Sequence, residues 1–148
     1  MFGIPDNDDL DVFSDAEIVA KTLYGEARGE IDQGRQAVAN VIANRVNSPV
    51  SWWGKTFRTV CLTPYQFSCW LPSDPNRAII VAATDADAIY QQCLTIANLA
   101  IDGKLDDITN GADSYLRTGT DAPWSRTLTP VAVIGHHSFY ITVKNVSS

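Results

Sequence analysis

Residues 14–46 read SDAEIVAKTLYGEARGEIDQGRQAVANVIANRV and contain two consecutive helix patterns. A capping box of Ser14 and Glu17 marks the first start, and the apolar residues after it recur at helical spacing as far as about Arg28. The second pattern begins at about Asp32, has apolar residues three and four positions apart, and stops at the Asn-Ser-Pro breaker that follows. Two amphipathic helices joined by a short glycine-containing turn are therefore predicted.

The rest of the chain predicts one further long helix and a small β-region. Residues 50–78 have no regular period and are rich in proline and aromatic side chains, which indicates a structured loop. A third helix is expected from about Asp85 to Asp102, with Gly103 as its stop. Three β-prone runs, separated by glycine and proline turns, follow at 112–116, 131–134 and 138–143. The expected fold class is α+β, with three main helices and a small antiparallel sheet or hairpin near the C-terminus.

The length of the chain favours a single domain, and its net charge disfavours some classes of function. The 148 residues suit one domain, with residues 1–13 as a polar leader and 14–148 as the folded unit. A net charge of −6 disfavours nucleic acid as a partner, because binding phosphates would need a concentrated basic patch. No apolar run approaches the roughly 20 residues that cross a bilayer, so no stable membrane insertion is expected. The start of the chain lacks the regions of a secretory signal, which predicts synthesis in the cytoplasm without a signal peptide.

The three cysteines are too few for a disulfide scaffold. Cys93 lies in an apolar helical stretch and is interpreted as a core residue. Cys61 and Cys69 bracket a short loop rich in proline and aromatics, where a disulfide would add stability if the enzyme ends in an oxidising compartment; two free thiols are the other alternative. The cysteines and the adjacent His136 and His137 lack the spacing of metal ligands, so no metal or other cofactor is expected.

The only glutamates in the chain are Glu17, Glu26 and Glu30. Glu17 belongs to the capping box. If the first helix persists, Glu26 and Glu30 lie on one face with their Cβ atoms about 6 Å apart. Two carboxylates that close favour keeping one of them protonated near neutral pH, as a general acid requires. The alternative is that Glu30 pairs with Arg35 or Arg28 and that Glu26 is only solvated.

Three blocks of the chain form a more specific pattern in combination. They are residues 23–30 with most of 34–46, then Gln66-Phe67-Ser68, then IGHHSFY at 134–140. In this order they resemble the cell wall hydrolase family named after the spore-cortex-lytic enzymes SleB and CwlJ, and the resemblance covers about residues 15–141. It implies a lysozyme-like helical core and a single catalytic domain. It also implies cleavage of peptidoglycan between N-acetylmuramic acid and N-acetylglucosamine, by a lytic transglycosylase.

The resemblance places the family's catalytic glutamate at Glu26. It implies that Glu26 protonates the bridging oxygen and then acts as a base on the C6 hydroxyl of muramic acid, which closes a 1,6-anhydro ring. This route needs only one carboxylate.

The resemblance also implies several substrate-binding side chains. Gln66 and Ser68 are expected on a loop facing the catalytic glutamate, with amide and hydroxyl groups suited to sugar contacts. Tyr115 and His137 match family positions, but they also suit a core tyrosine and a structural histidine. Gln66 has the alternative role of tying down loop backbone. His136 stands where the family often has asparagine, so no role is assigned to it. The expected substrate-binding set is Glu30, Gln66, Ser68, Tyr115 and His137.

Other activities remain alternatives. A muramidase-type hydrolase needs a second carboxylate, and Glu30, Asp113 and Asp121 are the candidates. An N-acetylmuramoyl-L-alanine amidase would combine a cysteine with His137 and an acid, although neither Cys61 nor Cys69 begins a convincing helix. A non-catalytic module would bind peptidoglycan through the aromatic loop alone.

The biological setting is predicted from size and the absence of a leader. A small monomeric enzyme of this kind suits a bacteriophage endolysin, made in the host cytoplasm and released by a holin to act on the cell wall in the periplasm. A bacterial or prophage-derived wall-remodelling enzyme is the alternative.

Overall fold

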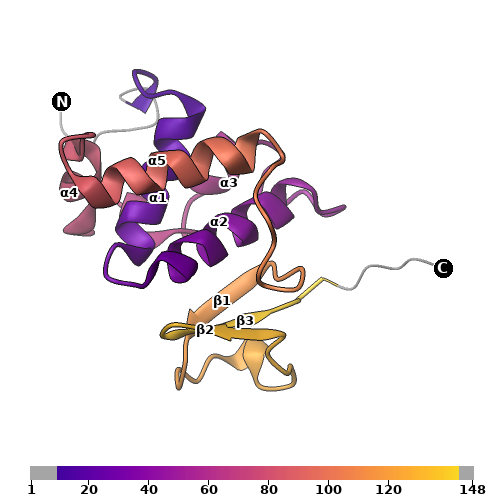
Figure 1. Cartoon of the computed structure of the whole chain (residues 1–148). Coiled ribbons are helices and arrows are strands. Elements are labelled where there is room, and N and C mark those ends of the chain that lie inside the picture. The colour runs from indigo at the N-terminus through magenta and orange to yellow at the C-terminus, as the bar shows by residue number, and fades with distance from the viewer. Residues whose placement is uncertain (1–9, 144–148) are drawn as a thin grey trace.

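The computed structural model describes residues 10–143. Within this range five α-helices form one part of the molecule, and a three-stranded sheet packs beneath them (Figure 1). Short 3-10 turns lie in two connections, η2 (Ser68–Trp70) and η3 (Pro123–Ser125). The helices are α1 (Asp15–Ala27), α2 (Asp32–Val46), α3 (Phe57–Leu62), α4 (Asn76–Ala82) and α5 (Ala88–Ile101), and the strands are β1 (Ser114–Arg117), β2 (Ala132–Ile134) and β3 (His137–Tyr140).

Helix α1 is the centre of the helical part and contacts α2, α3, α4 and α5. Its start confirms the predicted capping box. Ser14 Oγ accepts from the Glu17 backbone N–H at 3.1 Å, and Glu17 Oε1 accepts from the Ser14 N–H at 2.8 Å. Ile18 and Leu23 are fully buried, and even Lys21 is buried, where its ammonium caps three backbone carbonyls at the end of α4. Contacts with four other helices therefore hold α1 in place.

The sheet is antiparallel with strand order β1-β3-β2, which confirms the α+β class and its small C-terminal sheet. Tyr115 of β1 lies opposite Phe139 of β3. Phe139 is fully buried and packs with Ala37 and Val41 of α2 in a second, smaller core. This core attaches the sheet to α2 and positions β1 relative to the helices.

Residues 50–78 are more regular than predicted, because α3 forms within them and α4 begins at residue 76. A second capping box, made by Thr56 and Thr59, starts α3. The two helices have six and seven residues, which is too short for apolar periodicity to identify a helix. The prediction of an irregular loop was therefore wrong for these two segments.

The third predicted helix corresponds to α5, which begins a few residues later than expected. Asp87 is its N-cap and accepts from two backbone N–H groups of the first turn, and Gly103 ends the helix with φ +72° as predicted. Residues 1–9 of the predicted polar leader lie outside the described residues. Leu10 is buried, and the Phe13 ring lies 4.5 Å from the Lys21 ammonium, so the described end of the leader packs on the helical core.

All three cysteines are buried and free in the structure. None of the helices between residues 10 and 143 is long and apolar enough to span a membrane.

Candidate active site

Glu26 lies in the last turn of α1 and is half-buried against strand β1. The Tyr115 hydroxyl donates a hydrogen bond of 2.6 Å to Glu26 Oε1. Burial raises the pKa of Tyr115 well above its usual value, and the charge of Glu26 and this hydrogen bond raise it further. The phenol therefore stays protonated and donates to Glu26 at any working pH. Two predicted site residues, 89 positions apart in the chain, are thus in direct contact.

Gly25 allows a loop to pack closely against the end of α1 that carries Glu26. A Cβ added at Gly25 would lie 2.7 Å from Cys69 Cβ and 2.8 Å from Cys69 Sγ, closer than real Cβ atoms approach. Gln66 and Ser68 belong to the same loop; Gln66 is half-buried and Ser68 is exposed. The absence of a side chain at Gly25 therefore lets the loop that carries both residues pack against the helix turn that carries Glu26.

Arg45, at the end of α2, holds this loop and was missed by sequence reasoning. Its Nη1 donates to Gln66 Oε1 at 3.3 Å, and its Nε donates to the Asp113 carbonyl at 2.6 Å. The guanidinium is buried over the rings of Trp53 and Phe67, 5.0 and 5.4 Å from their centroids. Arg45 thus ties the loop to β1 and orients the Gln66 amide.

Arg45 did carry a signal in the sequence. It lies four residues after Val41, on the sheet-facing side of α2 where an apolar residue is expected. Burial lowers the pKa of Arg45, whereas the neighbouring carboxylates of Asp113 and Glu26 oppose that effect. A charged residue at a buried helical position needs specific partners, so this pattern marks a candidate site residue.

Glu30 does not lie beside Glu26 on one helix face, because α1 ends at Ala27. Its side chain, 9% exposed, accepts from the His136 backbone N–H and contacts His136 Nδ1, both at 2.9 Å. Arg35, the ion-pair partner considered from the sequence, instead donates to the Glu30 backbone carbonyl. Gly135, with φ +58°, leaves room for the carboxylate, since a Cβ there would overlap Glu30 Oε1.

The surroundings of Glu30 keep it ionised. Burial by itself raises the pKa of Glu30. The two hydrogen bonds from His136, together with the electrostatic effect of the nearby His137, outweigh burial, so the pKa of Glu30 is lowered. Glu30 therefore links the turn after α1 to the turn between β2 and β3. This position favours a structural role over the substrate contact that the sequence suggested.

His137 lies between the two glutamates. Its ring packs edge-on against Tyr115 with centroids 5.0 Å apart, and its Nδ1 is 3.8 Å from Glu30 Oε1. Within the described residues this buried Nδ1 has no hydrogen-bond partner. Burial lowers the pKa of His137, although the charges of Glu30 and Glu26 oppose it. The lowered pKa favours the neutral form of His137, whose ring packs against Tyr115, while His136 is exposed on the surface.

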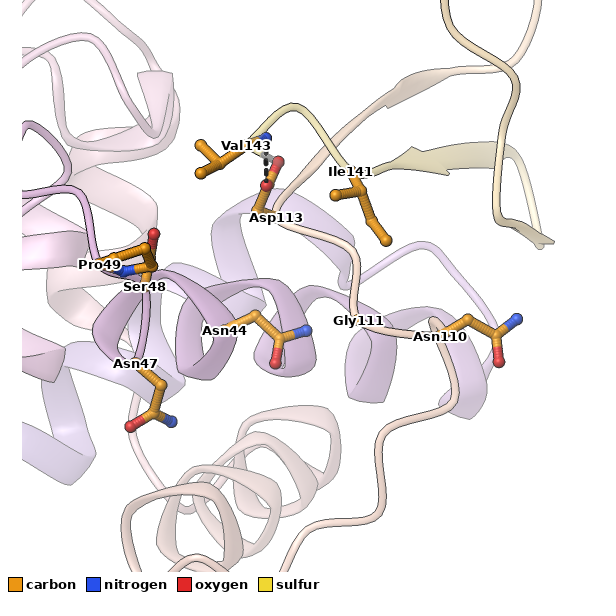
Figure 2. Close-up of a pocket in the computed structure, with 9 residues that line it drawn as sticks. All are labelled: Asn44, Asn47, Ser48, Pro49, Asn110, Gly111, Asp113, Ile141 and Val143. Atoms are coloured by element: carbon orange, nitrogen blue, oxygen red, sulfur yellow. Dashed lines mark hydrogen bonds between the residues drawn. The ribbon is translucent and has the colours of Figure 1, made fainter. Parts of the chain in front are cut away.

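Asp113 has a fully occupied carboxylate, so it is a poor second catalytic acid. It accepts from the backbone N–H groups of Thr142 and Val143 and from the hydroxyls of Ser114 and Thr142. Figure 2 shows the contact between Asp113 and the Val143 N–H. Asp113 also lines a cavity of about 450 Å³ between the end of α2 and the segment after β3. None of the expected catalytic or substrate-binding residues lines this cavity, and Asp113, the alternative second carboxylate, is part of its wall. The walls are Asn44, Asn47, Ser48, Pro49, Asn110, Gly111, Asp113, Ile141 and Val143.

The remaining alternative catalytic groups are also unsuited to their roles. The Asp121 carboxylate is exposed and receives hydrogen bonds from Nε and Nη2 of Arg126. Burial raises the pKa of the Cys61 thiol to about 12, and burial followed by the charge of Glu26 raises that of Cys69. A thiol held in its protonated form is a weak nucleophile, so the geometry disfavours a thiol amidase.

Comparison with known proteins identifies similar chains. The chain is 38% identical over 77 residues to a spore cortex-lytic enzyme of Oceanobacillus iheyensis, covering 47% of this chain and 27% of that enzyme. It is 51% identical over 37 residues to the spore cortex-lytic enzyme of Bacillus subtilis, covering 25% and 12% of the two chains. This chain therefore spans less than a third of the length of these curated relatives.

Two solved structures share most of the fold. The catalytic domain of the Bacillus cereus SleB protein superimposes with a TM-score of 0.68 at 30% identity, covering 85% of this chain and 88% of that one. The catalytic domain of the germination-specific lytic transglycosylase SleB of Bacillus anthracis gives 0.67 at 29% identity, covering 86% and 96%.

A family model described as Cell Wall Hydrolase matches residues 29–140. The matched segment includes Glu30, Gln66, Ser68, Tyr115 and His137 and begins three residues after Glu26. The segment covers most of the chain, and the chain therefore belongs to the cell wall hydrolase family.

Proposed function

We propose that this protein is a lytic transglycosylase that cleaves the bond between N-acetylmuramic acid and N-acetylglucosamine in peptidoglycan, with Glu26 as its acid and base. The contact between Glu26 and Tyr115 carries the proposal, because it fixes one half-buried carboxyl group at the junction of helices and sheet. The similarity to a structure described as a lytic transglycosylase supports the same chemistry.

The state of the other carboxylates favours a transglycosylase over a hydrolase. A hydrolase needs a second carboxylate that attacks the sugar or activates water. Glu30 is bound by His136, Asp113 by the segment after β3, and Asp121 by Arg126. Cleavage by internal ring closure needs only Glu26.

In the proposed reaction one carboxyl oxygen of Glu26 accepts the hydrogen bond from Tyr115, and the other transfers the proton. Tyr115 occupies Oε1, which leaves Oε2 to transfer the proton. Protonated Glu26 gives this proton to the glycosidic oxygen as the bond to muramic acid C1 breaks and the sugar gains oxocarbenium character. The resulting carboxylate then removes the proton from the C6 hydroxyl, whose oxygen bonds to C1 and closes the 1,6-anhydro ring. Glu26 is protonated again at the end of the cycle.

Gln66 and Ser68 are proposed to position the substrate. Arg45 donates to the Gln66 carbonyl oxygen, which leaves the amide nitrogen as the donor for a sugar carbonyl or hydroxyl. Ser68 is exposed on the same loop and offers a hydroxyl. We assign Glu30 and His137 to support of the site, since both are mostly buried.

The first test replaces the proton donor. Glu26→Gln keeps the size of the side chain and its hydrogen bond from Tyr115 but removes the acid, so we expect at least about a hundredfold loss of murein cleavage with an unchanged thermal midpoint. The matched control is Asp121→Asn, which removes an exposed carboxylate from the connection between β1 and β2. This variant is expected to keep full activity.

Mass spectrometry of the digested peptidoglycan separates the chemistries. Anhydro-muramic ends support the transglycosylase, reducing ends indicate a muramidase-type hydrolase, and freed stem peptides indicate an amidase. Full activity of Glu26→Gln would reject Glu26 as the catalytic residue. Binding of murein without any product would indicate a non-catalytic wall-binding module.

The setting as a monomeric phage endolysin that a holin releases into the periplasm stays a prediction from the sequence. Gel filtration measures the oligomeric state. Expression in a Gram-negative host with and without a co-expressed holin measures whether lysis depends on release through the membrane.

A further inference from the structure

Tyr65 combines an exposed aromatic ring with an unfavourable backbone. Its side chain is 82% exposed, and its φ is +68°. Within the described residues the other non-glycine residue with positive φ is Asn110, a residue type that tolerates this conformation well. A tyrosine in the left-handed region is strained, and the exposed side chain offers no packing that compensates for the strain.

The strain arises from a tight turn next to Gln66. The Gln66 backbone N–H donates to the Thr63 carbonyl at 3.2 Å, which closes a four-residue turn with Pro64 and Tyr65 at its centre. Proline followed by a residue of positive φ is the pattern of a type II turn, in which glycine is preferred at the second central position. Tyr65 therefore stands where the backbone favours glycine.

The turn determines where the two neighbouring side chains point. After it, Gln66 turns inward and accepts from Arg45, and Phe67 is 2% exposed. The same loop packs Cys69 against Gly25, directly beside Glu26. The Tyr65 ring thus points to solvent from the loop that packs, through Cys69, against the helix turn that carries Glu26.

We propose that the Tyr65 ring is a stacking platform for an N-acetyl sugar of the glycan strand, in a subsite next to the bond that Glu26 cleaves. The inference rests on the proposed function. A flat apolar face with a polar tip suits a sugar ring, which presents C–H groups on one face and hydroxyls at its edge. The two other strongly exposed aromatics, Trp52 and Trp124, each pack edge-on against a second ring.

The decisive variant is Tyr65→Gly. It relieves the strained backbone, which should raise stability, and it removes the aromatic ring, which should weaken glycan binding. Glycine suits φ +68°, so the thermal midpoint is expected to rise. Loss of the platform is expected to raise KM for soluble glycan strands about tenfold, with kcat within about twofold, since a well-placed aromatic contact is worth at least about a factor of ten in binding. Tyr65→Phe keeps the ring and is expected to retain the KM of the native protein.

Trp124→Ala is the matched control. It removes an exposed aromatic that packs on Tyr140, so it should lower the thermal midpoint and leave KM unchanged. Calorimetry of glycan binding in the Glu26→Gln background reports the platform without turnover. There, Tyr65→Gly should weaken Kd about tenfold.

An unchanged KM and an unchanged Kd in Tyr65→Gly would overturn the platform, and so would a lower thermal midpoint, which would assign the ring to folding. This failure is distinct from failure of the proposed function. In the latter case the native protein would make no anhydro-muramic ends, or Glu26→Gln would stay active.

Discussion

At the scale of single residues, the hydrogen bond from Tyr115 to Glu26 is the contact on which the proposed catalysis depends most. A charge-assisted hydrogen bond stabilises the carboxylate form of its acceptor. The proposed cycle uses Glu26 first as an acid and then as a base, so this bond balances the two steps. Because burial and the charge of Glu26 raise the pKa of Tyr115, the phenol cannot compete for the role of base.

Tyr115→Phe tests this balance. The ring and its packing against His137 remain, whereas the donor is lost, so we expect kcat to fall by about tenfold. Without the donor, Glu26 Oε1 loses the contact that orients the carboxyl group, so the loss should appear in kcat while KM stays within about twofold. A Tyr115 with a purely structural role would instead lower the thermal midpoint of Tyr115→Phe together with its activity.

At the scale of elements, the approach of η2 to α1 assembles the site. Gly25 is the only position of α1 without a side chain, and Cys69 fills the space above it. The helix turn that carries Glu26 and the loop that carries Gln66 and Ser68 therefore meet without a gap. A site formed in this way is sensitive to small increases in volume.

Gly25→Ala is expected to lower the free energy of unfolding by about 1–3 kcal/mol and to reduce kcat together with it, because the added methyl displaces the loop. Gly29→Ala is the matched control, since a Cβ there meets no atom within 4 Å and φ is not in the left-handed region. Urea unfolding of both variants measures the difference. Equal stability of the two alanine variants would contradict the packing argument.

At the scale of the whole molecule, two contacts attach the sheet to the helices in addition to the hydrogen bonds of Tyr115 and Arg45. One is the small apolar core around Phe139, and the other is the buried Glu30 carboxylate with its bonds to His136. The second contact gives the stability of the molecule a pH dependence. Both Glu30 and His137 have a pKa below the usual value in the folded protein, so the unfolded chain binds protons more readily.

The free energy of unfolding should therefore decrease as pH falls, first below about 6.5 through His137 and then below about 4.5 through Glu30. Glu30→Gln should be about 1–3 kcal/mol less stable at pH 7 and should lose the second part of the decrease. Denaturant unfolding between pH 4 and 8 measures both effects. A Glu30→Gln variant with the pH dependence of the native protein would contradict this assignment of Glu30.

Several elements were predictable because the interactions that form them are local. The capping box at Ser14, the periodicity of α2 and the glycine stop at Gly103 each depend on residues within about four positions. The short helices α3 and α4 were not predicted, since six or seven residues contain too few turns to show a period. The family motifs pointed to the site residues, although they did not show which of them touch.

The sequence alone was sufficient to predict the main helices, the α+β class and the family, because capping, periodicity and short motifs are properties of neighbouring residues. Only the tertiary structure decided that Tyr115 bonds to Glu26, that His136 and not an arginine binds the Glu30 carboxylate, and that Arg45 orients Gln66. These contacts join residues 21 to 106 positions apart, so they depend on how whole elements pack. No local pattern encodes a pairing over that separation, and packing of α1, α2 and the sheet alone brings the groups within hydrogen-bond distance.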